Sequence, residues 1–70
     1  MNDEVIEQVR AATLAIEGVE NFDITNSEST VNVLYKGTAS PANVYATLHF
    51  GAVGKALQAE KLTLLVHRRP

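Results

Sequence analysis

Hydrophobic residues recur at helical spacing near the start of the chain and predict an amphipathic helix with one apolar stripe. Asn2 or Asp3 can cap the start of this helix, because a short polar side chain accepts hydrogen bonds from the free amides of a first turn. Gly18 is the expected end, since glycine readily adopts the left-handed conformation that closes a helix. The repeating apolar positions are Val5, Val9, Ala12 and Ile16.

Strict alternation of apolar and polar residues follows and predicts strands with one buried face. Residues 19–25 and 30–36 alternate on either side of the polar run 26–29, as in an antiparallel hairpin. Residues 61–67 alternate again and form the last predicted strand. The positions expected to face the core are Phe22, Ile24, Val31, Val33, Tyr35, Leu62, Leu64 and Val66.

A second helix is predicted between the hairpin and the last strand. Ser40 and Pro41 form a strong helix start, because serine caps the free amides and proline is tolerated at the first helical position. Val44 and Leu48, with Tyr45 or Ala52 beside them, give this helix its apolar side. Two glycines, Gly51 and Gly54, each weaken a helix by about 1 kcal/mol relative to alanine. We therefore expect a break between these glycines.

The order helix, strand, strand, helix, strand predicts an α+β fold. We expect a two-layer sandwich, with two helices on one face of a small, mainly antiparallel sheet. Residues 1–70 form a single domain near the lower size limit for a self-sufficient core. The chain has no cysteine, so disulfides and thiolate metal sites are excluded.

Charge is unevenly distributed along the chain. Residues 1–28 contain seven acids and one base, whereas residues 29–70 contain five bases and one acid. The two halves can attract each other within one molecule or, alternatively, between copies joined head to tail. The net charge of −2 argues against nucleic acid as a partner. Phe22 and Tyr35 fall on buried strand faces, which leaves no aromatic platform for stacking bases.

Membrane and compartment signals are sparse. No apolar run approaches the roughly 20 residues that cross a bilayer, and the start of the chain is acidic where a secretory signal is basic. We expect a cytoplasmic protein by default, or an envelope protein if the chain is an excised assembly domain. Membrane association is then expected only through a larger assembly.

Residues that could carry chemistry are isolated from one another. His49 falls on the second predicted helix and His67 on the last strand, without an evident third ligand. Glu20 and Asp23 have no neighbouring histidine or glycine-rich loop, so solvated strand residues are expected. The segment 51–55 lacks the glycine spacing of a phosphate loop. We predict no enzymatic activity, cofactor, metal site or small-molecule substrate.

Several segments together resemble a heavy-metal-associated domain of the ferredoxin-like class. They are the first helix, the run Ile16-Glu17-Gly18-Val19-Glu20, the strand Thr30–Tyr35 and the second helix, which opens at Ser40-Pro41 and runs to a glycine. The resemblance implies metal handling, which in that family depends on a cysteine pair before the first helix. Those positions fall here on Asn2 and Val5, and the family's first strand is absent.

The order of elements also resembles that of BON domains and of ring-building modules in bacterial envelope machines. Gly37 after the second strand and Gly51-Ala52-Val53 before the last are similar to their sparse glycine pattern. This resemblance implies lipid or protein association in the cell envelope, without catalysis.

The expected function is a non-enzymatic binding or assembly module that acts through a protein partner or self-association. The alternative is a metal-handling domain without thiolate ligands. Without the first ferredoxin-like strand, the last strand must pair directly with the hairpin or a strand must be borrowed from a partner. The uncovered sheet face or an adjacent edge is the expected contact surface. Its predicted interface residues are Leu34, Lys36, Lys61, Leu65 and His67.

Overall fold

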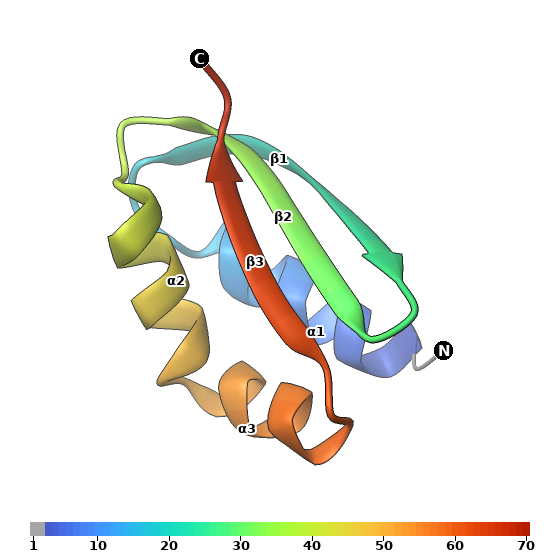
Figure 1. Ribbon diagram of the computed structural model, residues 1–70. Coiled ribbons are helices and arrows are strands. Elements are labelled where there is room, and N and C mark those ends of the chain that lie inside the picture. The colour runs from blue at the N-terminus through green and yellow to red at the C-terminus, as the bar shows by residue number, and fades with distance from the viewer. Residues whose placement is uncertain (1–2) are drawn as a thin grey trace.

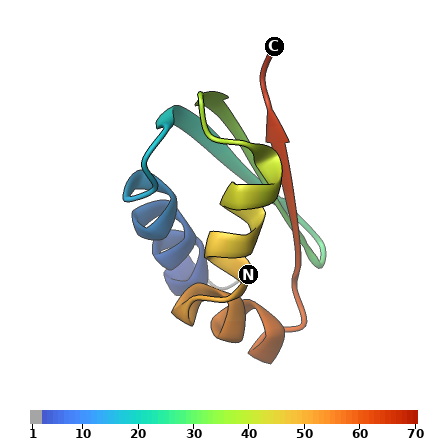
Figure 2. The ribbon, with the colours of Figure 1, turned by 90° about the vertical axis from the view of Figure 1, so that its left-hand side faces the viewer.

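The structure, a computed structural model, describes residues 3–70. Its elements are α1 (Asp3–Leu14), β1 (Val19–Ser27), β2 (Thr30–Gly37), α2 (Pro41–His49), α3 (Ala52–Ala59) and β3 (Thr63–Arg68). Figure 1 looks onto the sheet from its bare face, and Figure 2 shows the helices on the other side. The predicted α+β two-layer sandwich is therefore confirmed. None of the helices in this described part of the chain is long and apolar enough to cross a bilayer.

The sheet has the strand order β1-β2-β3, with β2 in the centre. β1 and β2 are antiparallel, whereas β3 runs parallel to β2, with Val33 opposite Val66. The sheet is thus mixed rather than mainly antiparallel, because the helical crossover returns the chain to the end at which β2 began. Of the two routes foreseen for the last strand, the structure has direct pairing with the hairpin.

The hairpin pairs over a longer stretch than predicted. Ser27 lies opposite Thr30, so only Glu28 and Ser29 remain in the turn. Glu28 has a positive φ of 51°, which lets the chain reverse within two residues. Both strands consequently extend beyond the predicted bounds 19–25 and 30–36.

Burial confirms the predicted phase of the strands. Val31, Val33 and Tyr35 of the central strand are fully buried, and so are Val9 of α1 and Val44 of α2. Leu64 of β3 is also buried, whereas the other inward residues of the outer strands are less enclosed, because β1 and β3 each have a neighbour on one side only. Those partly buried residues at or beside the two outer strands are Phe22, Ile24, Leu62 and Val66.

The first helix ends earlier than predicted, at Leu14 rather than at Gly18. The amides of Ala15 and Ile16 donate to carbonyls three residues back, at 3.2 and 3.1 Å, so the chain tightens after the helix. Gly18, with φ 92°, lies in the following turn into β1. Of the two predicted caps, Asn2 lies outside the described residues.

The second predicted helix is divided into α2 and α3, which gives three helices where two were expected. Its start is as predicted, because the Ser40 hydroxyl accepts a hydrogen bond from the Asn43 amide and Pro41 is the first helical residue. The break lies at Phe50 and Gly51 rather than between Gly51 and Gly54, so Gly54 is inside α3. A Cβ at Gly54 would lie 1.7 Å from the His49 carbonyl oxygen. Glycine is therefore required for α3 to start so close to the end of α2.

The last strand begins at Thr63, two residues later than predicted. Lys61 has a φ of 57°, and its amide donates to the Gln58 carbonyl at 3.0 Å. This residue therefore belongs to the turn that ends α3 and is not part of the strand.

Candidate functional site

The sheet face that no helix covers is the candidate functional surface, and we call it the outer face. Its side chains come from all three strands and point away from the core, as the alternation of the strands requires. The outer face consists of Asn21, Asp23 and Thr25 of β1, Asn32, Leu34 and Lys36 of β2, Leu65 and His67 of β3, and Arg69.

Two leucines lie next to each other on this otherwise polar surface. Leu34 is 37% exposed and Leu65 is 43% exposed. Leu34 lies opposite His67 of β3, and Leu65 lies opposite Asn32 of β2. The leucines are thus diagonal neighbours on adjacent strands, within reach of one partner side chain.

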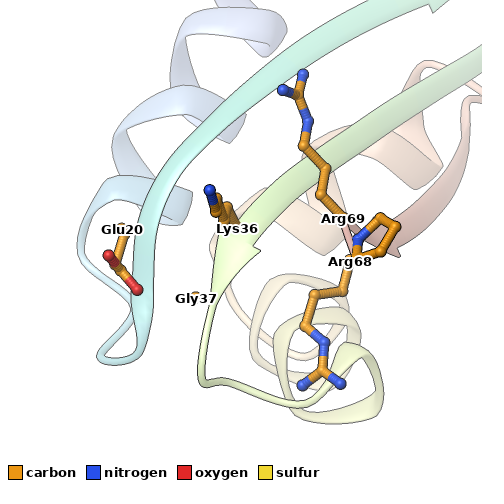
Figure 3. A pocket seen from close by; sticks show the side chains of 6 residues that line it. Glu20, Lys36, Gly37, Arg68 and Arg69 are labelled. Carbon is orange, nitrogen blue, oxygen red and sulfur yellow. The ribbon is translucent and has the colours of Figure 1, made fainter.

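An ion pair crosses one end of the outer face. The Arg69 guanidinium contacts the Asp23 carboxylate on the far strand. The backbone supports this reach, since the Arg69 amide donates to the Tyr35 carbonyl at 2.7 Å and continues the pairing of β3 with β2. Figure 3 shows the side chains of Lys36 and Arg69 directed toward β1, and that of Arg68 directed the other way.

The same end of the sheet contains an open pocket of about 460 Å³. Its lining combines three basic side chains with one carboxylate, that of Glu20. The lining is therefore basic in balance, although its cations do not converge, since Arg68 is directed away from Lys36 and Arg69 (Figure 3). The lining residues are Glu20, Lys36, Gly37, Arg68, Arg69 and Pro70.

The structure brings together four of the five predicted interface residues. Leu34, Lys36, Leu65 and His67 all lie on the outer face. Lys61 does not, because it lies in the turn before β3. The prediction also missed Arg69, although its odd position continues the series that begins with Leu65 and His67.

A second exposed feature, a cluster of aromatic rings at the end of α2, was not foreseen. Tyr45 and His49 stack with ring centroids 5.4 Å apart, and the His49 and Phe50 rings meet edge to face at 4.8 Å. Phe50 is 82% exposed. The spacing of Tyr45 and His49, one helical turn apart, was the available sequence signal.

Gly51 and the first three residues of α3 form a Gly-x-x-Gly sequence where two helices meet. In one class of RNA-binding module, a Gly-x-x-Gly loop clamps the backbone of single-stranded nucleic acid. Here Val53 and Gly54 are buried against the core. Half of this segment is therefore buried, and the close approach of Gly54 to the His49 carbonyl accounts for the second glycine.

Metal ligands do not gather within residues 3–70. No group of three or more His, Asp or Glu side chains in this range could hold an ion. His49 lies at the end of α2 and His67 on the outer face, so the two histidines lie on different layers of the sandwich.

Comparison with known proteins returned no matching family model, no matching curated protein and no matching solved structure. The resemblances of the sequence to heavy-metal-associated and BON domains therefore stay predictions.

Proposed function

We propose that this protein is a non-enzymatic binding and assembly module that associates with a protein partner through its outer face. The observation that carries the proposal is the uncovered sheet face with Leu34 and Leu65 side by side and exposed. Sheets bury an apolar face against another layer, and an antiparallel or mixed sheet with one wet face normally presents polar residues there.

The size of the apolar contribution indicates what kind of contact this is. Complete burial of a fully exposed leucine is worth about 1.5–3 kcal/mol. Because Leu34 and Leu65 are already more than half enclosed, covering both contributes about 1–2 kcal/mol. Micromolar binding requires about 8 kcal/mol. The partner must therefore also contact the polar residues around the leucines. Its contact surface should cover most of the outer face.

The metal-handling alternative has less support from the described residues. The heavy-metal-associated family, which the sequence resembles, binds soft metal ions through thiolates, and this chain has no cysteine. Association through the outer face, by contrast, depends only on side chains that this chain contains.

Affinity capture from the organism that encodes the protein tests the proposal. The double substitution Leu34→Ser with Leu65→Ser removes both exposed leucines of the outer face. Phe50→Ser is the matched control, since it removes a more exposed apolar side chain from the opposite layer. We expect the wild-type chain and the control to retain the same partner and the double variant to lose it. Equal retention by all three chains contradicts the proposal. Calorimetry with the purified partner then measures the affinity.

A further inference from the structure

We propose that the occupant of the outer face is the exposed side of α1 from a second copy of this chain. The proposal rests on the function proposed above and names its partner. It implies a head-to-tail contact, in which each molecule offers its outer face to one neighbour and its α1 to another.

The exposed side of α1 carries a large apolar residue that is mostly open to solvent. Val5, Val9 and Thr13 face the core, which leaves Glu7, Ala11 and Leu14 on the opposite side at helical spacing. Leu14 is 72% exposed. A leucine with a small residue one turn before it suits contact with the two leucines of the outer face.

Charge favours the same pairing. The first turn of α1 contains Asp3 and Glu4, and Glu7 follows one turn later. The single base of this helix is Arg10, which contacts Glu7 at 3.3 Å, so the helix contains three acids and one base. The outer face has the opposite balance. Lys36 and Arg69 carry two positive charges. Asp23, which pairs with Arg69, carries one negative charge.

The dimensions of the two surfaces agree. A helix of 12 residues is about 18 Å long at 1.5 Å per residue. Strands of 6 to 9 residues span about 20–30 Å at 3.3 Å per residue. One helix can therefore lie along the outer face. A helix bound there would form a second helical layer, which open sheets in α/β proteins commonly have.

The position of α1 makes the contact intermolecular. α1 lies on the far side of the sheet from the outer face, so the two surfaces cannot meet within one molecule (Figure 2). Two different surfaces on opposite sides give a heterologous contact, which repeats from copy to copy. Association should consequently continue past the dimer as concentration rises.

The aromatic cluster of α2 is the other exposed apolar feature that could serve as the occupant. The charged residue nearest to it in the sequence is Lys55 of α3, which is exposed. A basic neighbour is unfavourable opposite Lys36 and Arg69, whereas the acids of α1 are favourable. Charge therefore selects α1 over the aromatic cluster.

Sedimentation velocity with complementary variants tests this inference. Leu14→Ser disables α1 and keeps the outer face, whereas Leu34→Ser with Leu65→Ser does the reverse. We expect the sedimentation coefficient of the wild-type chain to rise with concentration between about 10 µM and 1 mM, where weak interfaces associate, and to rise less in high salt. Each variant alone should stay monomeric, with a dissociation constant at least tenfold larger than that of the wild-type chain. An equimolar mixture of the two variants should form a one-to-one heterodimer, because one intact helix then meets one intact face.

The remaining outcomes separate this inference from the proposed function. Self-association that is lost in the double variant but kept in Leu14→Ser overturns the role of α1 and leaves the outer face as the association surface. A wild-type chain that stays monomeric throughout overturns the second copy as partner, and the capture experiment then decides the proposed function. Association that survives in both variants overturns the contact between α1 and the outer face, and the capture experiment again decides the proposed function. Phe50→Ser controls for general loss of apolar surface, and circular dichroism confirms that each variant is folded.

Discussion

Val33→Ala tests whether the alternation of the sheet has been assigned to the correct face. Val33 is 0% exposed, lies on the central strand, and has Ile24 and Val66 as its neighbours on either side. Asn32 precedes it on the same strand and faces outward, so Asn32→Ala is the matched control. The two substitutions differ by one position along the chain and act on opposite faces of the sheet.

The magnitude follows from the burial. Valine to alanine removes two carbon groups, each worth about 0.8 kcal/mol on complete burial, and the vacated space adds a further cost. We expect a loss of about 2 kcal/mol for Val33→Ala. A chain of 70 residues has a free energy of unfolding of about 4–10 kcal/mol, so this loss is a large fraction. Asn32→Ala should change stability by less than about 0.5 kcal/mol.

Urea unfolding monitored by circular dichroism measures both variants against the wild-type chain. In thermal unfolding, the loss at Val33 should lower Tm by about 8–16 °C, because 1 kcal/mol corresponds to about 4–8 °C in a domain of this size. Equal losses at Val33 and Asn32 would show that the assigned phase is wrong.

Three further predictions concern the helix junction, a buried hydroxyl and metal ions. Gly54→Ala should lower the free energy of unfolding, measured in urea, by about 2 kcal/mol despite the higher helix propensity of alanine. The reason is that the new Cβ would collide with the His49 carbonyl. A stabilised variant contradicts this packing. Tyr35→Phe should cost about 1 kcal/mol in thermal unfolding, because the buried hydroxyl donates a hydrogen bond, whereas Tyr45→Phe, at an exposed site, should cost little. Titration with Cu(I), Zn(II) and Ni(II) should reveal no tight Cu(I) site, and zinc bound by the histidines should be weak. Submicromolar Cu(I) binding that survives His49→Ala with His67→Ala would contradict this view.

The core of the fold could be predicted because it follows from short-range patterns in the sequence. The inward set that includes Val31, Val33 and Tyr35 follows from a period of two, and the start of α2 follows from Ser40 and Pro41. Each of these features depends on residues that are close in sequence, so no knowledge of the rest of the molecule was needed.

The features that were missed depend on contacts between distant segments. The pairing of β3 with β2 depends on where the helical crossover returns the chain, and the ion pair from Arg69 to Asp23 depends on that pairing. Gly18 suggested a helix end by its identity alone. The helix stops at Leu14, because the chain must turn there before β1 can pair with the sheet. Lys61 fitted the strand alternation, yet the turn that ends α3 takes it out of the strand.

The exposed aromatic cluster was missed for a related reason. A helical pattern shows which residues share a side, but the neighbouring elements decide which sides are covered. The helical pattern places Tyr45 beside the apolar stripe of Val44 and Leu48. In the structure Tyr45 lies at the margin of that stripe, and its side chain is partly exposed. Its stacking on His49 therefore became visible only in the folded chain.

Protection of a single thiol on the outer face is the most direct test of the central claim. Because the chain has no cysteine, Thr25→Cys introduces a unique thiol on this face, and Gln58→Cys introduces a control thiol on the exposed side of α3. Maleimide labelling rates are measured for both variants with and without an excess of the wild-type chain or of the captured partner. If the outer face is the contact surface, labelling at Thr25→Cys slows in proportion to the fraction bound, while labelling at Gln58→Cys is unchanged. Equal labelling of the outer-face thiol when association is complete would contradict it.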